Sequence, residues 1–391
     1  MKTIIIGGGI AGVSCAGELR RLSPKVEITV ISEEGGPLYS RLLLPHYIRG
    51  QVLREKIFLR SENWYQEQGI KIIIGRAEKV DYQNKFVATS DGRELPFDKL
   101  VIASGRYTRL FNPLPLGELG GGESDKRGVS YLWRLEDADH LKQLINEVSN
   151  SSSVAVYGGG LIACEFINIF KHFDFKISVA FRGEHFWSRI LNQSSGEIVA
   201  RHLESQGIEV LPRAQLLRLE GEEELSKVVT DKKNIDCRIL GVGIGLEPDT
   251  GWLKDSGLKF GKGIIVNEKM ETNLFGVYAI GDVAEVFDIF SGRHRIMGTW
   301  VAAQGQGKVA ARNLVGQNSV FDQVTISTMK LLGLDVVFLG DVNRGWADEI
   351  KDEVSLNNEA VQIFYKNKKV IGATLVNRNN ERAKILSQIK N

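Results

Sequence analysis

The chain has 391 residues, which predicts two or three domains at a rough prior of one domain per ~150 residues. Its formal net charge is +2, so the overall charge gives no indication of binding to nucleic acid or to an anionic membrane. No uninterrupted apolar run approaches the ~20 residues that a membrane-spanning helix needs. The composition therefore predicts a soluble globular protein that partners neither nucleic acid nor a membrane.

The start of the chain runs from Met1 directly into the apolar segment Ile4–Ile6 and a glycine turn. This leaves no room for a cleavable signal peptide, so a cytoplasmic location is expected. The three cysteines, Cys15, Cys164 and Cys237, lie far apart and form no Cys-x-x-Cys pair or mixed cysteine and histidine cluster. We therefore predict neither a disulfide framework nor a metal site, and we expect the cysteines to be buried.

The first glycine-rich segment, Gly7-x-Gly9-x-x-Gly12, follows a β-branched run and precedes a helical pattern from Val13 to Leu22 and an apolar strand at Val26–Ile31. In this spacing the first glycine permits a tight turn and the second lets the backbone approach a pyrophosphate. The third lets helix and strand pack closely, with the phosphates at the positive end of the helix dipole. The segment therefore predicts a dinucleotide-binding fold.

An acidic residue about twenty positions after the third glycine is expected to bind the ribose hydroxyl groups. Glu33 and Glu34 lie 21 and 22 positions beyond Gly12, at the end of the second strand. Because strand, glycines, helix and acid keep the expected spacing, these glycines and both glutamates are predicted nucleotide contacts. An unspecialised strand-turn-helix is the less favoured alternative.

The same pattern returns 151 positions later. Gly158, Gly160 and Ala163 take the places of the three glycines, after a strand-like run at 154–157 and before a helical pattern from Cys164 to Phe173. Alanine in the third place is compatible with the packing role of that position. We therefore predict a second dinucleotide-binding fold that uses these residues.

The end of the second strand in this copy lacks the ribose-binding acid of NAD-preferring proteins, since Phe181 is followed by Arg182. Arg182 and Arg189 could bind a 2′-phosphate through charge-assisted hydrogen bonds, which would favour NADPH. Both arginines are equally well explained as solvated side chains on a loop that also contains Glu184 and His185. The choice between NADH and NADPH stays open.

The segment from about Gln317 alternates strand-like runs with polar turns and ends in a helical stretch from Glu381 to Ile389. This pattern predicts a third, smaller α+β unit. Its strand-like runs are Val336–Leu339, Ala360–Tyr365 and Val370–Leu375. A glycine-rich stretch from Gly117 to Gly128 is typical of a surface connection.

Two dinucleotide motifs in one chain of this length resemble the pyridine nucleotide-disulfide oxidoreductase superfamily. Residues 100–105 resemble its strand ending Ala-Thr-Gly, where the chain returns to the FAD domain, and residues 241–248 resemble the crossover out of the NAD domain. Residues 272–284 resemble the second FAD motif, whose aspartate binds the ribityl chain or a nearby phosphate. The cofactor contacts that this resemblance implies are Ala103, Ser104, Gly105, Gly243, Gly281 and Asp282.

The resemblance implies an α/β fold with two nested Rossmann-type domains and a small α+β C-terminal domain. The implied boundaries are 1–112 and 243–316 for the FAD domain, 113–242 for the NAD(P) domain and 317–391 for the C-terminal domain. FAD together with NADH or NADPH are the implied cofactors.

The stretch from Tyr39 to Gly50 lies where disulfide reductases of the superfamily carry Cys-x4-Cys, and where coenzyme A disulfide reductases and NADH peroxidases carry a single redox cysteine. Here the cysteine position is apolar, so we expect no thiol chemistry at the flavin. The stretch is similar to the Tyr-x-Arg-Pro-x-Leu-Ser-Lys segment of NAD(P)H:rubredoxin oxidoreductases, assimilatory nitrite reductases and oxygenase-coupled ferredoxin reductases. The likeness implies a cofactor contact for Arg41.

The sequence departs from that pattern beside the flavin. The family's lysine near N5 falls at His46 and the preceding serine at Pro45, whereas the lysine's usual glutamate partner is present as Glu165. We expect a His46–Glu165 pair to replace it, with an imidazole that can titrate near neutral pH. Each residue also has an ordinary explanation, Glu165 as a first-turn acid that the helix dipole favours and His46 as a loop histidine.

The resemblance implies an FAD-dependent NAD(P)H oxidoreductase that accepts a hydride at flavin N5 and passes electrons to a small redox protein such as rubredoxin or ferredoxin. Three alternatives fit the same residues. They are a peroxide-forming NAD(P)H oxidase, the flavin subunit of a larger redox complex, and a flavoprotein kept for binding with little turnover. The sequence leaves the acceptor and the oligomeric state open.

Overall fold

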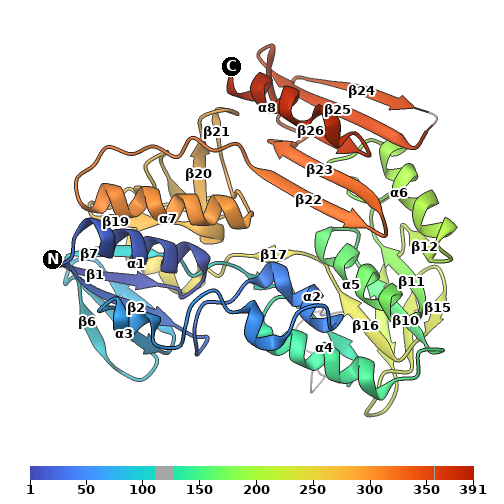
Figure 1. The fold of residues 1–391 in the computed structure, drawn as a ribbon, viewed down its shortest axis with the longest axis horizontal. Helices are drawn as coiled ribbons and strands as arrows, with labels where there is room; N and C mark the ends of the chain where they lie inside the picture. Colours follow the sequence, from blue (N-terminus) through green and yellow to red (C-terminus); the bar gives the residue numbers. More distant parts are fainter. Residues whose placement is uncertain (111–126, 356) are drawn as a thin grey trace. The chain divides into compact units, whose positions relative to one another are not determined.

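The computed structural model describes residues 1–110, 127–355 and 357–391. The chain divides into two compact units (Figure 1). Unit 1 contains Met1–Tyr39, Phe58–Tyr107 and Glu247–Thr325, and unit 2 contains Ser40–Ile57, Thr108–Leu246 and Ile326–Asn391. The predicted boundary between residues 112 and 113, and most of the glycine-rich connection 117–128, lie outside the described residues.

The centre of unit 1 is a five-stranded parallel sheet in the order β19-β7-β1-β2-β3. Its strands are β1 (Lys2–Ile6), β2 (Glu27–Ser32), β3 (Lys71–Ile74), β7 (Lys99–Ile102) and β19 (Val277–Ala279). β1 and β7 are almost uninterrupted apolar runs and are buried, as expected of parallel strands that are covered on both faces. This sheet confirms the first Rossmann-type fold.

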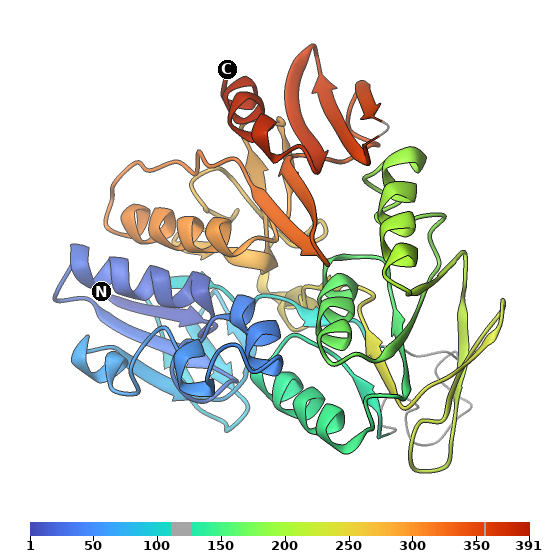
Figure 2. The same cartoon turned by 45° about the vertical axis from the view of Figure 1, so that its right-hand side comes forward.

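Two helices of unit 1, α1 (Ile10–Leu22) and α7 (Trp300–Leu314), lie side by side (Figure 2). Their backbones approach closely, because a Cβ at Gly307 would lie 2.4 Å from the carbonyl oxygen of Ala11. The remaining described elements of unit 1 are two small sheets and short helices. These are β4 (Ala77–Asp81), β5 (Phe86–Thr89), β6 (Glu94–Pro96), β18 (Ile264–Val266), β20 (Ala284–Asp288), β21 (Arg293–Arg295), α3 (Trp64–Glu67), η4 (Gly251–Ser256) and η5 (Gly281–Val283).

Unit 2 contains a second parallel sheet, in the order β12-β11-β10-β16-β9. Its strands are β9 (Val129–Ser130), β10 (Ser153–Tyr157), β11 (Lys176–Phe181), β12 (Glu209–Pro212) and β16 (Ile239–Val242). The helices of this part are α2 (Leu44–Ile48), α4 (Leu135–Glu147), α5 (Leu161–His172) and α6 (Gln193–Ser205), and a small antiparallel sheet contains β13 (Leu216–Glu220), β14 (Lys227–Thr230) and β15 (Asn234–Asp236). The second Rossmann-type fold is thereby confirmed.

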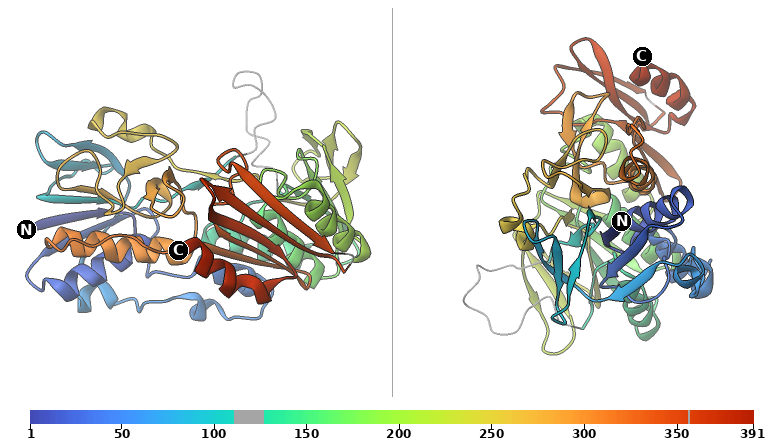
Figure 3. Two further views of the ribbon diagram at one scale, coloured as in Figure 1. Left: turned by 90° about the horizontal axis from the view of Figure 1, so that it is seen from above. Right: turned by 90° about the vertical axis from the view of Figure 1, so that its left-hand side faces the viewer.

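The C-terminal part of unit 2 is a five-stranded antiparallel sheet in the order β22-β23-β26-β25-β24, against which α8 (Arg382–Lys390) packs (Figure 3, left). Its strands are β22 (Ile326–Leu331), β23 (Leu334–Gly340), β24 (Glu349–Ser355), β25 (Glu359–Lys366) and β26 (Lys369–Val376). The α+β prediction is confirmed, and β23, β25 and β26 were each predicted. The sequence pattern missed β22 and β24. The reason at β24 is that it is a charged, exposed edge strand without alternating apolar residues.

Among the described residues no helix is long and apolar enough to cross a membrane.

Candidate functional site

The first glycine loop joins β1 to α1 in unit 1. Gly7 has φ +118°, and a Cβ there would lie 2.1 Å from the carbonyl oxygen of Ala103. A Cβ at Gly12 would lie 2.0 Å from the carbonyl oxygen of Gly7, so the helix and the turn pack too closely for any larger residue. At Gly9, by contrast, a Cβ would meet nothing within 4 Å. The loop is closed around its first and third glycines and open in front of its second.

The end of β7 lies beside this loop. The amide nitrogen of Ser104 is 3.1 Å from the position of a Cβ on Gly7, and Gly105 turns the chain with φ +75°. The hydroxyl oxygen of Ser104 is buried and has no hydrogen-bond partner within the described structure. A buried hydroxyl in this state needs a partner, and a phosphate or hydroxyl group of a bound dinucleotide would supply one.

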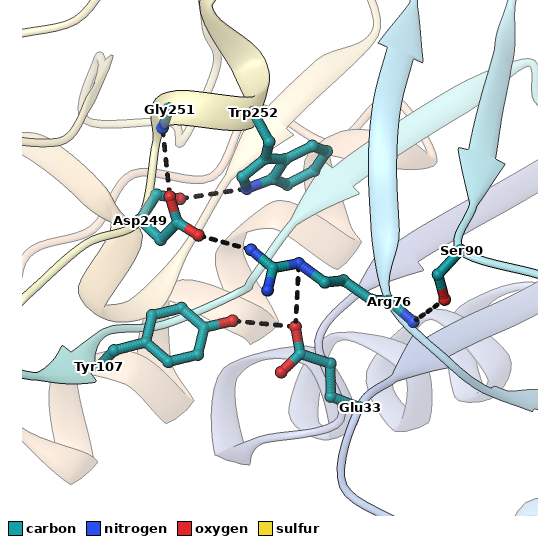
Figure 4. A network of polar contacts seen from close by, with 7 residues as sticks. All are labelled: Glu33, Arg76, Ser90, Tyr107, Asp249, Gly251 and Trp252. Atoms are coloured by element: carbon teal, nitrogen blue, oxygen red, sulfur yellow. Dashed lines mark hydrogen bonds and ion pairs between the residues drawn. The ribbon is translucent and has the colours of Figure 1, made fainter. Parts of the chain in front are cut away.

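The carboxylate of Glu33 belongs to a polar network (Figure 4). The Tyr107 hydroxyl donates to Glu33 Oε1 at 3.1 Å, and Arg76 Nε lies 3.7 Å from the same oxygen. Arg76 in turn donates through Nη2 to Asp249 Oδ2 at 2.8 Å. Arg76 thus links Glu33, the predicted ribose-binding acid, to Asp249 in the third stretch of unit 1. Tyr107 and Arg76 together position the Glu33 carboxylate.

Asp249 is itself held by neighbouring groups. The backbone N–H of Gly251 donates to its carboxylate at 3.3 Å, and the Trp252 indole donates to its carbonyl oxygen at 3.1 Å. The backbone N–H of Arg76 donates to the Ser90 hydroxyl at 3.4 Å.

The second predicted acid, Glu34, accepts a hydrogen bond from the Tyr39 hydroxyl. Of these residues, sequence reasoning predicted the two glutamates and missed Arg76, Asp249 and the two tyrosines, Tyr39 and Tyr107.

Asp282, the predicted acid of the second FAD motif, forms an ion pair with Arg106. Arg106 donates through Nε at 2.9 Å and through Nη2 at 2.6 Å to one carboxylate oxygen, and both side chains are less than one fifth exposed. Gly281, with φ +73°, donates its N–H to Gln306 Oε1 at 2.7 Å. These contacts fix the start of η5. No local sequence pattern predicts the role of Arg106, because its partner lies 176 positions away.

The second glycine loop, between β10 and α5 in unit 2, repeats the geometry of the first. Gly158 has φ +141°, and its Cβ would lie 2.2 Å from the carbonyl oxygen of Gly243. A Cβ on Gly243 would lie 2.7 Å from the amide nitrogen of Ala163, which is fully buried. A Cβ at Gly160 would meet nothing within 4 Å. Alanine therefore fits the third place, and Gly243 provides the close approach.

The two arginines that follow β11 are exposed. Within the described residues neither Arg182 nor Arg189 forms a hydrogen bond or an ion pair, whereas their neighbour Glu184 lies 3.3 Å from Arg213. Glu184 therefore does not neutralise Arg182. The structure is compatible with both explanations of these arginines, so their role remains a prediction.

The segment with the predicted flavin-facing residues forms η1 (Arg41–Leu43) and α2 in unit 2. Arg41 hydrogen-bonds to the Trp133 carbonyl group, and its guanidinium carbon lies 4.8 Å from the centre of the Trp133 ring. His46 is exposed, and its Nδ1 lies 2.9 Å from Gln51 Oε1. These contacts hold both side chains within their own unit.

Glu165, in the first turn of α5, shares no hydrogen bond or ion pair with His46 in the described structure. Burial raises the pKa of the Glu165 carboxyl group, and the charges of Arg49 and His46 and a hydrogen bond from Asn168 partly offset that rise. Arg49 Nη2 also lies 3.4 Å from His46 Nδ1. The structure therefore adds a permanent cation beside the predicted pair. Sequence reasoning missed Arg49, although its position one helical turn after His46 was a usable signal.

All three cysteines are buried, as predicted. Burial raises the pKa of Cys15 and of Cys237 to about 12, and it raises the pKa of Cys164 well above the ordinary range. Only thiolates react as nucleophiles, so these groups are unreactive near neutral pH. Among the described residues, no three His, Cys, Asp or Glu side chains are grouped to hold a metal ion.

We expect iodoacetamide treatment of the folded protein at pH 7.5 to leave NAD(P)H-dependent dye reduction nearly unchanged, because the thiols are buried and protonated. Mass spectrometry should show little labelling, and the same treatment in denaturant should label three sites. Loss of dye reduction with an unchanged circular dichroism spectrum would contradict the absence of thiol chemistry.

Both glycine loops fit a bound dinucleotide. Gly9 and Gly160 occupy the N-cap positions of α1 and α5, and neither helix start is capped by a side chain. The first N–H groups of these helices are therefore free of a side-chain cap and face the open side of each loop, where the helix dipole favours phosphate.

Comparison with curated proteins gives relatives whose similarity extends over 85% or more of the chain. It is 31% identical over 341 residues to the NADH oxidase of Methanocaldococcus jannaschii, covering 85% of this chain and 74% of that protein. It is 27% identical over 384 residues to a rubredoxin-NAD(+) reductase of Pseudomonas putida, covering 96% of each. It is also 27% identical over 400 residues to nitrite reductase [NAD(P)H] of Bacillus subtilis. The chain spans about half of that last relative, 47% of its length.

Among solved structures, the covalent putidaredoxin reductase-putidaredoxin complex matches with a TM-score of 0.89 at 22% identity, covering 99% of this chain and 93% of that chain. This likeness concerns the fold. The family model described as pyridine nucleotide-disulphide oxidoreductase matches residues 1–307. The match covers most of the chain and both glycine loops, and the protein therefore belongs to the pyridine nucleotide-disulphide oxidoreductase family.

Proposed function

We propose that this protein is an FAD-dependent NAD(P)H oxidoreductase that passes electrons to a small redox protein such as rubredoxin or ferredoxin. The observation that carries the proposal is the pair of glycine loops, each open in front of its second glycine at the start of an uncapped helix, in a chain whose cysteines are all buried. Bound FAD would supply acceptance of a hydride at N5 and release of single electrons.

The residues of unit 1 would hold FAD. Gly9 permits the backbone to approach the pyrophosphate, and Ser104 offers a buried hydroxyl without a partner. Glu33, positioned by Tyr107 and Arg76, would bind the ribose hydroxyl groups. The other predicted contacts in this unit are Gly7, Gly12, Glu34, Ala103, Gly105, Gly281 and Asp282.

The residues of unit 2 would hold the nicotinamide nucleotide. Gly158, Gly160, Ala163 and Gly243 form its loop, and Arg182 would contact a 2′-phosphate if the nucleotide is NADPH. The proposed residues beside the isoalloxazine are His46 and Glu165, and Arg41 is a proposed cofactor contact. Arg49, whose Nη2 lies 3.4 Å from His46 Nδ1, would lie next to this pair.

The relatives support a protein acceptor. The rubredoxin-NAD(+) reductase matches over 96% of its length, so no large additional part of it lies outside the likeness. The putidaredoxin reductase, a structural neighbour over 99% of this chain, was solved in a covalent complex with putidaredoxin.

Two other functions have specific support. The NADH oxidase relative favours an oxidase, in which oxygen takes the electrons. The nitrite reductase relative, of which this chain spans 47%, favours a flavin subunit of a larger redox complex. An oxidase would give the same turnover with and without a carrier protein, and a subunit would co-purify with a second redox chain.

The deciding experiment measures FAD content first and then turnover with NADH and with NADPH. Reduction of rubredoxin or of a [2Fe-2S] ferredoxin should exceed oxygen consumption at least about tenfold. A colourless protein that takes up no added FAD would overturn the proposal. Turnover that is unaffected by either carrier protein would instead identify the protein as an oxidase.

His46→Ala is expected to lower the flavin midpoint potential and to slow flavin reduction by NAD(P)H, with FAD content unchanged. An imidazole near N5 donates a hydrogen bond to the electron-rich reduced flavin ring. In its protonated form it also stabilises that ring through its positive charge. Glu165→Gln should act in the same direction but less strongly. Photoreduction against a reference dye measures the potential, and an identical potential in His46→Ala would make His46 an ordinary surface histidine.

A further inference from the structure

A loop of unit 2, residues 182–192, joins β11 to α6 and carries both arginines discussed above. At its centre Trp187 has φ +49°, in the left-handed region that bulky residues rarely adopt. Its side chain is only 8% exposed, and its N–H donates to the carbonyl oxygen of Gly159 at 3.2 Å. The loop is therefore tied directly to the second glycine loop.

The other side of this loop contacts the C-terminal sheet at two points. The Trp187 ring meets the Phe338 ring of β23 edge to face, with centres 5.5 Å apart. The backbone N–H of Asn192 donates to Gln362 Oε1 of β25 at 2.9 Å. Phe338 is 7% exposed and Gln362 is fully buried, so both contacts are shielded from water.

These two side chains lie in one row across the sheet. Phe338 pairs with Thr374 of β26, and Thr374 pairs with Gln362 of β25. Directly opposite residues of an antiparallel sheet point to the same face. The Thr374 hydroxyl also donates to Gln362 Oε1 at 3.4 Å. The register of three strands thus sets the spacing at which the sheet meets Trp187 and Asn192.

The contact with β11 runs through a chain of rings. The Phe181 and Phe186 ring centres are 4.7 Å apart, and those of Phe186 and Trp187 are 5.9 Å apart. Phe181 is the last residue of β11 and directly precedes Arg182. Ring contacts therefore link Trp187 to Phe181, the residue directly before Arg182.

This arrangement is energetically costly in two ways. Trp187 holds a left-handed backbone conformation, and both its indole N–H and the side-chain N–H₂ of Gln362 are buried without a hydrogen-bond partner in the described structure. Strained residues persist only where the surroundings fix them, and they cluster at ligand-binding sites. Buried donors without a partner are rare in folded proteins.

We propose that the C-terminal sheet is a positioning element for the nicotinamide nucleotide. Through Phe338 and Gln362 it holds loop 182–192 against the second glycine loop, so that Arg182 is placed beside the adenosine ribose. The inference rests on the proposed function, since it names how unit 2 binds the nucleotide.

The sheet does not depend on this loop for its place in unit 2. Asn168 of α5 donates through Nδ2 to the Lys330 carbonyl at 2.9 Å and accepts the Leu332 N–H at 3.0 Å. His202 of α6 lies 3.1 Å from the Leu331 carbonyl oxygen. Substitutions that alter the contact with loop 182–192 leave these contacts in place. The contact of the sheet with the loop can therefore be tested separately from its attachment to α5 and α6.

Phe338→Leu is expected to raise the dissociation constants of NADPH and NADH about threefold to tenfold, because a loosened loop must be ordered on binding. FAD content should be unchanged. Phe338→Tyr keeps the ring and should bind both nucleotides nearly as the parent does, whereas Gln362→Leu removes the acceptor for Asn192 and should weaken binding. Affinities are measured on the oxidised, FAD-loaded protein, by titration with slowly reacting analogues of NADPH and of NADH.

Val337→Ala is the matched control. Val337 neighbours Phe338 on β23, is 1% exposed and points to the opposite face, so the change weakens the sheet without touching the loop. Equal weakening by Val337→Ala and Phe338→Leu, or unchanged affinity in Phe338→Leu, would overturn the positioning role while the proposed function stands. If the parent protein binds neither nucleotide, the proposed function fails as well. Arg182→Ala should reproduce the loss for NADPH and leave NADH unchanged.

Discussion

Gly9→Ala is expected to give a normally folded apoprotein whose dissociation constant for FAD is raised about tenfold to a hundredfold. Gly9 has φ −75° and ψ −176°, an extended conformation that any residue adopts, and a Cβ there meets nothing within 4 Å. The methyl group would instead occupy the space through which the backbone approaches the pyrophosphate. Losing one charge-assisted hydrogen bond costs about 1.5–3 kcal/mol, which is the basis of the expected range.

The comparison that makes this result specific is Gly12→Ala. Its Cβ would lie 2.0 Å from the Gly7 carbonyl oxygen, so α1 or the turn must move, and the apoprotein itself should be destabilised by about 1–3 kcal/mol. Denaturant unfolding of both apoproteins and fluorescence titration with FAD measure the two effects. Tight FAD binding by Gly9→Ala would show that the first loop does not hold the pyrophosphate.

Gly160→Ala should leave FAD binding intact and weaken binding of the nicotinamide nucleotide, whereas Gly9→Ala should weaken FAD binding. Gly160 is also extended, with φ −117° and ψ −170°, and its Cβ meets nothing within 4 Å. The variant should therefore remain yellow with full FAD content. Its dissociation constant for NAD(P)H should rise about tenfold or more, for the reason given for Gly9.

Rapid mixing with NAD(P)H measures this defect directly, and reduction by dithionite is the control that shows an intact flavin. Loss of FAD from Gly160→Ala would mean that the second loop supports the flavin site. Unaltered reduction across nucleotide concentrations would remove the second loop from nucleotide binding.

The parts of the molecule that sequence reasoning predicted are those set by neighbouring residues. A β-branched run, three glycines and a helical pattern define β1, the loop and α1, since each requirement acts within about fifteen residues. The same holds for β10 and α5, where Ala163 fits the packing role of the third glycine. Both helices begin earlier than the helical patterns predicted, which started at Val13 and Cys164. α1 begins at Ile10 and α5 at Leu161, directly after the open glycines.

The parts that could not be predicted depend on pairs that are distant in sequence. Tyr107 lies 74 positions from Glu33, and Arg76 lies 173 positions from Asp249. No local pattern marks such a pair, because each residue alone is an ordinary polar side chain. The contact of Trp187 with Phe338 is hidden for the same reason, and only the pairing register of the C-terminal sheet reveals it.

The division of the chain into interleaved segments has a consequence for its synthesis. Each unit is assembled from three separate stretches, so unit 1 is incomplete until Thr325 has been made, and unit 2 combines Ser40–Ile57 with a stretch that begins at Ile326. Pairings between stretches so far apart close slowly. On the ribosome, the apolar strand β7, which ends at Ile102, must wait without its neighbour β19, which begins at Val277, while some 175 residues are added at ~5–20 residues per second. We expect shielding of that strand by chaperones during this interval to raise the yield of folded protein.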